Sequence, residues 1–388
     1  MPGFSRRLPE SVEPNALTRA IARLQAAGIA CMDLTESNPT RVEIPYPPHL
    51  LAPLGDSRGL RYDPHPFGLA AARAAVAADQ SRRGAIVDPA QVVLTASTSE
   101  AYSWLFKLLC NPGECVLVPR PSYPLFEHLA RLEGIRAEPY DLDYGTRWEI
   151  DLASVASAPD DVRAVVVVSP NNPTGSYAAA GELERLGALC RGRGWALVAD
   201  EVFADYPLDA QAPVTDVAVR AECLAFTLGG LSKSLGLPQL KLGWMIAGGP
   251  PEARDAALAA LELIADTFLS VGTPVQAAAA ALLAEGGAVR QAIHERVRIN
   301  LACLRSLATE WPACEVLRVE GGWSAVVRVP AHRSEEQLVL EVLERERILV
   351  HPGYFFDFPR EAYIIVSLLP LSDAFAAAMP RVLRAASF

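Results

Sequence analysis

Short apolar runs alternate with helical periods from residue 69 to residue 230. The runs are QVVLT, ECVLVP, RAVVVVSP, WALVADEVF and CLAFTLGG. Runs that are apolar on both faces are typical of strands in a parallel sheet that helices cover. Between the runs, Ala101, Leu105 and Leu108 share one helical face, and a second helical segment ends at Gly194. The alternation predicts an α/β fold with a mostly parallel sheet.

The N-terminal region predicts a helix followed by an extended loop. Leu17, Ile21 and Leu24 follow the spacing of one helix face, which predicts a helix between Pro14 and Ile29. Residues 33–50 are rich in proline and polar side chains and show no helical period, so we expect them to cross the surface as a loop. Loops of this kind often carry binding residues.

The last quarter of the chain follows a different pattern. A long helix, the strands ACEVLRV and WSAVVRV, a helix rich in glutamate and arginine, and two further strands predict an α+β unit. It closes with a helix that we expect Ser372 to cap and Pro380 to kink. We therefore predict a large domain over residues 46–285 and a smaller domain formed by residues 1–45 and 286–388.

Composition and charge argue against several classes of protein. The formal net charge is −10 and the isoelectric point is near 5.2, whereas a nucleic-acid partner normally requires a basic surface. No stretch reaches the roughly 18 consecutive apolar residues of a membrane helix. The N-terminus MPGFSRRLPE has no apolar core after its arginines, so we expect a cytoplasmic protein. The seven cysteines include no C-x-x-C pair and the six histidines are scattered, so we expect no metal site.

Three polar side chains stand at or just past the ends of separate predicted strands. They are Asn172, Asp200 and Lys233. Ligands of an open parallel sheet bind beyond the carboxyl ends of its strands. A lysine there can form a Schiff base once burial lowers its pKa, and a strand-borne aspartate can keep the pyridine nitrogen of pyridoxal phosphate protonated. Taken singly, the three could also be a solvated lysine, a helix cap and a turn residue.

The segments around these residues resemble a known family. SPNNPTG, ADEVFADY and LSKSLGLPQLKLGW are similar to three signature blocks of the class I/II aminotransferases, which are pyridoxal-phosphate enzymes of fold type I, like aspartate aminotransferase. The resemblance runs over nearly the whole chain. It implies that Lys233 carries the cofactor as a Schiff base and then moves a proton, that Asp200 holds the pyridine nitrogen, and that Asn172 donates to the phenolic oxygen. Residues 46–285 would be the cofactor-binding domain.

The resemblance also implies contacts to the rest of the cofactor. Ser97 and Thr98, in LTASTSEAY, would bind the phosphate at the start of a helix, although an ordinary helix cap is the alternative. Ser232 would face the same phosphate. Tyr123, in RPSYPLFEH, would stack on the pyridine ring, with a core aromatic as the alternative. Tyr62 would cross to the phosphate of a partner subunit, which implies a homodimer with shared active sites.

Three positions depart from the family pattern. Phe203 replaces a tyrosine that donates to the cofactor oxygen. Lys241 replaces an arginine of the phosphate site, which keeps the charge and loses the bidentate fork. Ile365 replaces the arginine that binds the substrate α-carboxylate.

Another cation must bind that carboxylate if amino acids are the substrates. Our candidate is Arg41, with Asn38 in the same loop, and Arg328 is a weaker choice; a solvated surface arginine is the alternative. Residues 265–276 contain no arginine to hold a second carboxylate, so we do not expect dicarboxylate substrates.

The resulting hypothesis is an aminotransferase that moves an amino group from an amino acid or related amine to a 2-oxo acid. Another pyridoxal-phosphate enzyme acting at Cα, a lyase or a cyclase, is the alternative, because one fold hosts many reactions. A protein that binds the cofactor without turnover is a third possibility.

Overall fold

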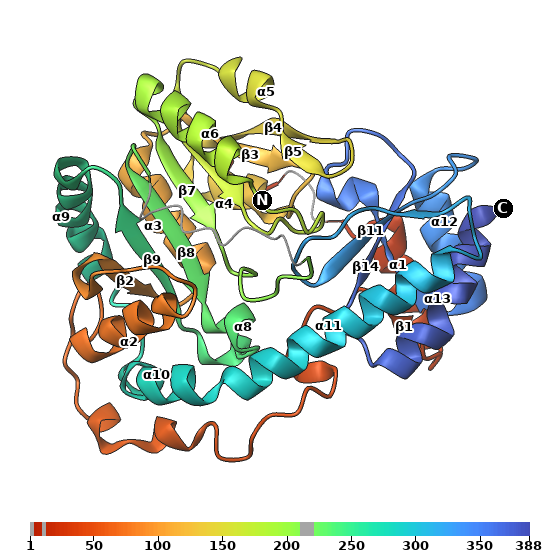
Figure 1. The fold of residues 1–388 in the computed structure, drawn as a ribbon, viewed down its shortest axis with the longest axis horizontal. Coiled ribbons are helices and arrows are strands. Elements are labelled where there is room, and N and C mark those ends of the chain that lie inside the picture. The colour runs from red at the N-terminus through yellow and green to blue at the C-terminus, as the bar shows by residue number, and fades with distance from the viewer. Residues whose placement is uncertain (1–3, 10–12, 210–220) are drawn as a thin grey trace.

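The largest element of the computed structural model is an eight-stranded sheet (Figure 1). The structure describes residues 4–9, 13–209 and 221–388. The strand order is β2-β9-β8-β7-β6-β3-β4-β5, and β4, β3, β6, β7 and β8 run parallel to one another. The five predicted runs are confirmed as β2 (Val92–Thr95), β3 (Cys115–Arg120), β6 (Val162–Val168), β7 (Ala196–Asp200) and β8 (Ala225–Gly230). The predicted α/β fold with a mostly parallel sheet is therefore confirmed.

The sequence pattern missed three strands of this sheet. They are β4 (Arg136–Tyr144), β5 (Trp148–Ile150) and β9 (Gly243–Gly248). β4 lies near one edge, and of its residues only Tyr140 and Leu142 are buried, so it lacks the continuous apolar run of a central strand. β9 is antiparallel to both of its neighbours, β2 and β8, and begins and ends with glycine. Glycine is depleted in strands and weakens such a prediction.

Helices cover both faces of the sheet. α3 (Thr98–Leu109), α4 (Leu125–Glu133) and α9 (Pro251–Phe268) lie on one face. α5 (Leu152–Ala156) and α6 (Ala180–Arg193) lie on the other. Within β3, Val116 and Val118 pack with the first group, whereas Cys115 and Leu117 pack with the second. This alternation explains why the central strands are apolar at every position.

The N-terminal segment packs on the C-terminal part of the chain. The predicted first helix is confirmed as α1 (Ala16–Ala26), which Asn15 caps by accepting a hydrogen bond from the Thr18 amide. β1 (Met32–Asp33) then pairs in parallel with β12 (Ile348–Leu349). The loop that follows β1 is thereby held close to the C-terminal strands.

The C-terminal part combines helices with a second, antiparallel sheet. Its strands are β10 (Glu315–Val316), β11 (Ser324–Arg328), β13 (His351–Pro352) and β14 (Tyr363–Ser367), in the order β10-β11-β14-β13. Its helices are α11 (Gly287–Ala308), α12 (Glu335–Glu341), a π-helical turn η6 (Val342–Glu346) and α13 (Ser372–Ser387). α11 runs from the large sheet to α13 (Figure 1).

The last helix corrects one prediction. Pro380 lies inside α13 as expected, but the cap position is Leu371 and makes no side-chain cap bond. Ser372 is therefore the first residue of the helix and not its cap, because the chain enters its helical turn one residue earlier than predicted. The remaining helices of the described residues are α2 (Ala70–Ser81), α8 (Leu231–Ser234), α10 (Thr273–Glu285) and the short 3-10 turns η1 (Pro39–Arg41), η2 (Ala52–Gly55), η3 (Ser57–Leu60), η4 (Pro89–Gln91), η5 (Pro238–Leu240) and η7 (Gly353–Phe356).

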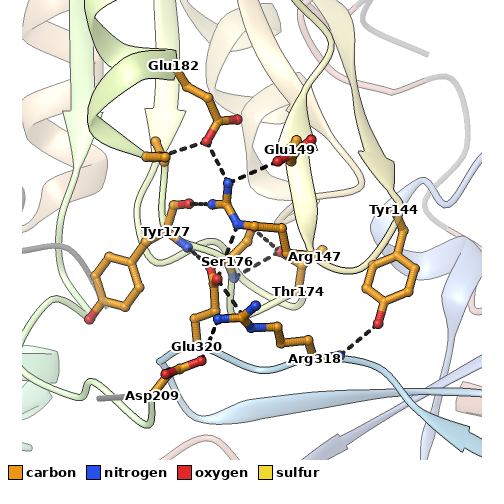
Figure 2. Close-up of polar contacts among 12 residues, drawn as sticks. Tyr144, Arg147, Glu149, Thr174, Ser176, Tyr177, Glu182, Asp209, Arg318 and Glu320 are labelled. Carbon is orange, nitrogen blue, oxygen red and sulfur yellow. Dashed lines mark hydrogen bonds and ion pairs between the residues drawn. The ribbon is translucent and has the colours of Figure 1, made fainter. Parts of the chain in front are cut away.

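A buried ion network fixes the segment before β11 to the large sheet (Figure 2). The guanidinium of Arg147 contacts Glu182 of α6 at 3.0 Å and Glu320 at 3.2 Å, and both carboxylates are buried. Glu320 also accepts a hydrogen bond from the Tyr177 amide at 3.0 Å. Each buried charge is therefore paired and hydrogen-bonded, which offsets the cost of taking it out of water.

Backbone contacts complete this junction. The amides of Glu320 and Gly321 both donate to the Gly175 carbonyl, at 3.0 and 2.9 Å. Gly175 has a φ of +69°, and a Cβ there would lie 2.7 Å from the Gly321 carbonyl oxygen, so only glycine permits this approach. The loop after β6 and the start of β11 are thus held side by side.

Among the described residues, no helix combines the length and the apolar character needed to cross a membrane.

Candidate active site

A pocket of about 280 Å³ lies at the carboxyl ends of β6, β7 and β8. Asn172, Asp200 and Lys233 all line it, so the structure brings together the three side chains that the strand ends predicted. The opposite wall comes from the second sheet and from the loop after β1. The structure thus has a concave site at the sheet edge where open parallel sheets bind ligands.

Lys233 lies on α8, directly after β8, with its partly buried side chain in the pocket wall. The hydroxyl of Tyr206 donates to the carbonyl of Lys233 at 2.7 Å, which fixes the backbone there. Its Nζ lies 5.3 Å from the ring centre of Phe203 and 5.0 Å from that of Trp323. Burial lowers the pKa of Lys233 to about 8, although the charge of Asp200 acts in the opposite direction. The amine is therefore more often neutral and nucleophilic than an ordinary lysine.

Asp200 ends β7 as a buried carboxylate. Burial raises its pKa, while the Val202 amide, the Tyr102 hydroxyl and the charge of Lys233 favour the ionised form. The amide donates to Oδ1 at 3.1 Å and the hydroxyl donates to Oδ2 at 2.9 Å. Sequence reasoning missed Tyr102, although it stands four residues after Thr98 and therefore on the same face of α3.

Asn172 joins the two walls of the pocket. Its Oδ1 accepts a hydrogen bond from the Ser324 hydroxyl of β11 at 3.2 Å. Its amide nitrogen is the remaining side-chain group that can donate to a ligand.

The N-terminus of α3 faces the same pocket. Thr98 and Ser99 line it, together with Ser232. Ser97 is the helix cap: its hydroxyl accepts a hydrogen bond from the Glu100 amide at 3.1 Å, and it does not line the pocket. A twelve-residue helix presents its positive dipole end here, which favours an anion.

The other predicted cofactor contacts divide into two groups. Tyr123 lines the pocket and is 47% exposed, so it is not a core aromatic. Lys241 is exposed and does not line the pocket. Tyr62 is 74% exposed and lines a separate, smaller cavity.

The structure does not bring the predicted carboxylate-binding residues into the pocket. The side chain of Arg41 is 73% exposed and lies 3.8 Å from Glu36. Asn38 caps the short turn η1 by accepting a hydrogen bond from the Thr40 amide at 3.0 Å. Arg328 is exposed and pairs with a glutamate on β10.

Sequence reasoning also missed most of the opposite wall. Ile365 lines the pocket, as its place in the family pattern implied. The missed residues are Thr35, Ser37, Trp323, Ser324, His351, Phe356 and Ser367. Of these, Ser367 could have been found, because it stands two residues after Ile365 on the same face of β14.

The chain is similar to known proteins over most of its length. The family model described as aminotransferase class I and II matches residues 31–368. The chain belongs to this family. Among its relatives, alanine aminotransferase from Mycobacterium tuberculosis (strain CDC 1551 / Oshkosh) is 29% identical over 306 residues, covering 76% of this chain and 70% of the relative. Glutamate-pyruvate aminotransferase AlaA from Escherichia coli (strain K12) is 26% identical over 314 residues, covering 79% and 78%.

A solved structure shows the same fold for this class I/II aminotransferase. Alanine aminotransferase from Pyrococcus furiosus superposes with a TM-score of 0.88 at 23% identity, covering 98% of this chain and 99% of the other. Class I/II aminotransferases use pyridoxal phosphate, and this chain is a pyridoxal-phosphate-dependent aminotransferase. The lyase or cyclase alternative is not favoured, because these relatives carry aminotransferase names.

The pocket of this aminotransferase fits its cofactor. Lys233 offers an amine whose pKa burial has lowered, for covalent attachment to an aldehyde. Burial disfavours the charge of Asp200, and a cationic ring nitrogen would offset that penalty. The start of α3 provides donors for a phosphate.

The lowered pKa of Lys233 predicts how the apoprotein takes up the cofactor. The neutral amine is the reacting form, so the rate of covalent attachment should rise as the pH rises through about 8. The measurement is the growth of the absorption band of the attached cofactor after mixing, over a range of pH. A simple alkyl amine, reacting with the same cofactor, provides the control for the cofactor's own ionisations. A midpoint as high as that of the alkyl amine, near pH 10 to 11, would contradict the expected burial effect.

Proposed function

We propose that this aminotransferase takes small, neutral amino acids as amino donors and 2-oxo acids as acceptors. The convergence of Lys233, Asp200 and Asn172 in one pocket is the observation that carries the proposal. The name of the relative alanine aminotransferase supports alanine as a donor, and the name glutamate-pyruvate aminotransferase supports a 2-oxo acid as the acceptor. No arginine is found among the described residues that line the pocket, which disfavours a second substrate carboxylate.

The proposed roles follow the geometry. Bound pyridoxal phosphate supplies an electron sink for the bond to substrate Cα. Lys233 attaches the cofactor and, once released by the substrate amine, moves a proton at Cα. Asp200 holds the ring nitrogen protonated, and Asn172 donates its amide to the ring oxygen. Tyr123 stacks on the ring.

The phosphate contacts are a separate part of the proposal. Thr98, with the backbone amides that begin α3, and Ser232 bind the phosphate. Ser97 contributes by capping the helix, so it orients the amides. Lys241 adds a positive charge near this end from outside the pocket.

The test is a two-substrate assay with purified protein. Alanine with a 2-oxo acid acceptor should yield pyruvate and the amino acid that corresponds to the acceptor. With serine or cysteine, whose β substituent can leave, pyruvate and ammonia formed without an acceptor would indicate a lyase. No product from a panel of neutral amino acids and acceptors would overturn the proposed function.

Arg41 remains our sequence-based candidate for a carboxylate contact, because Ser37 of the same loop lines the pocket. If Arg41 binds the carboxylate, in place of a residue of the pocket wall, Arg41→Ala should raise the Michaelis constant for amino acids about ten- to a hundredfold, since a charged contact is lost. Amines without a carboxylate should react as before. The matched control is Arg305→Ala, which removes an exposed arginine from α11. Equal Michaelis constants for amino acids in both variants would remove Arg41 from the site.

We further propose a homodimer in which Tyr62 reaches the phosphate of the partner subunit. Tyr62 is highly exposed and does not line the active-site pocket of its own subunit, which supports this arrangement.

Within each subunit, residues 46–285 would form the large domain, and residues 1–45 with 286–388 the small domain, as the pairing of β1 with β12 suggests. A cytoplasmic location agrees with the seven free cysteines. Sedimentation of the purified protein tests the dimer.

A further inference from the structure

We propose that His351 binds the substrate carboxylate, at the place where Ile365 leaves the pocket without an arginine. The inference rests on the proposed function, because it assumes that the donor is an amino acid. Among the described residues that line the pocket, Lys233 and His351 are the two whose side chains can be cationic. Lys233 is committed to the cofactor. His351 is therefore the remaining pocket residue whose ring can donate a hydrogen bond to a carboxylate, with a charge added when the ring is protonated.

The register of the second sheet places His351 beside Ile365. β13 and β14 are antiparallel, and His351 is the direct partner of Ile365. Side chains of directly opposed residues lie on the same face of a sheet, about 4.5–5.5 Å apart at Cβ. Both residues line the pocket. The imidazole thus reaches the space that a long side chain at position 365 would otherwise occupy.

The imidazole is held in position but lacks a polar partner. Its ring packs against Phe355 and Phe356, with 5.7 Å between ring centres in each case. Within the described part of the chain, the buried Nδ1 atom has no hydrogen-bond partner. No described protein group therefore competes with a ligand for a hydrogen bond to this ring nitrogen. Burial lowers the pKa of His351, and the charge of Asp33 opposes that shift.

The neighbouring hydroxyl groups of Ser367 and Ser324 are less able to donate a hydrogen bond to a carboxylate, because each already donates to a protein oxygen. Ser367 donates to the Glu36 carbonyl at 2.6 Å, and Ser324 donates to Asn172. The indole Nε1 of Trp323 is buried without a partner among the described residues and lines the same wall. We infer that His351 is the main carboxylate ligand and that Trp323 is a second donor.

This arrangement determines the class of substrate. An imidazole presents a single donor to the ligand, whereas guanidinium presents a bidentate fork, so the carboxylate is held with less geometric constraint. The surrounding wall is apolar at Ile365 and Phe356. The site therefore suits monocarboxylic amino acids with small side chains.

Binding of propanoate to the holoenzyme tests the role of His351 without turnover. Propanoate has the carboxylate and the small side chain of alanine but no amine. His351→Phe keeps a ring of similar shape and removes both nitrogens, and it should weaken propanoate binding, measured by calorimetry, about ten- to a hundredfold. His351→Gln keeps a donor and should lose less affinity. The control is His332→Phe, which alters an exposed histidine outside the pocket.

Two further readouts separate binding from folding. The cofactor absorption band should persist in His351→Phe, and its Michaelis constant for alanine should rise while the rate with ethylamine stays within about twofold of the parent. Ile365→Arg, added to His351→Phe, should restore propanoate binding by supplying the missing cation. Unchanged propanoate affinity in His351→Phe, or no saturable binding to the parent protein, would overturn the proposal. If the parent binds propanoate through His351 but transaminates no amino acid, the proposed function fails and the carboxylate site stands.

Discussion

Lys233→Ala is expected to abolish covalent attachment of the cofactor and to lower turnover by at least about 10²–10⁴-fold, the usual contribution of a positioned acid-base group. The chain contains three lysines, at positions 107, 233 and 241, so few alternative attachment points exist. Lys107 is on the outer surface of α3, where it pairs with Glu133. Of the three lysines, Lys233 is the one that lines the pocket among the described residues. Burial lowers the pKa of its amine. The variant should bind the cofactor reversibly and lack the absorption band of the attached form.

Borohydride reduction followed by peptide mapping gives the most direct readout. In the parent protein the label should appear on the peptide that contains Lys233. Lys107→Ala serves as the matched control and should label and turn over like the parent. A labelled adduct at another lysine in Lys233→Ala, with retained turnover, would exclude the assignment.

Asp200→Asn is expected to leave the cofactor bound while turnover falls by about 10²–10³-fold, as for other groups that stabilise developing charge. The amide is nearly the same size, and its single oxygen can still accept the hydrogen bond that the Val202 amide donates to Oδ1. Its NH2 group then stands in place of Oδ2 and can donate to the Tyr102 hydroxyl, which accepted no hydrogen bond from the carboxylate. It carries no negative charge to keep the ring nitrogen protonated, so the electron sink is weakened. The phosphate contacts at the start of α3 are untouched.

The measurements are the stoichiometry of bound cofactor and the single-turnover rate with alanine. Asp255→Asn, at an exposed position of α9 that pairs with Arg254, is the control. Near-normal turnover in Asp200→Asn would show that this carboxylate does not contact the ring. Loss of the cofactor itself would show that Asp200 contributes mainly to binding.

Sequence patterns predicted the central strands because burial on both faces leaves a continuous apolar run, as in β6 and β7. They failed where the environment is one-sided or glycine-rich. β4 lies near a sheet edge and is mostly not buried, and β9 is bounded by Gly243 and Gly248. The cap of the last helix was misplaced by one residue, because Ser372 is a favourable cap by type but the backbone turns earlier.

The residues of the candidate site likewise divide into those that the sequence could predict and those that depend on tertiary structure. Asn172, Asp200 and Lys233 could be predicted because each stands at or just past the end of a recognisable strand of one sheet, and strand ends of a parallel sheet meet. His351 could not, because β13 is two residues long and has no periodicity, and its pairing with Ile365 depends on tertiary register. Arg41 was chosen by charge and loop position, whereas its rotamer and exposure depend on packing that the sequence does not encode locally.

The pairing of β1 with β12 has a consequence for the order in which the protein matures. A nascent chain emerges N-terminus first, so the β1 segment must wait for a partner near residue 348. The large sheet, with Asn172, Asp200 and Lys233, is synthesised before that partner exists. The loop that carries Thr35 and Ser37, and the strand that carries His351, close over it afterwards. A cofactor bound during synthesis would therefore enter an incomplete pocket that is open on one side. The pocket could select among amino acids only after β1 has paired with β12.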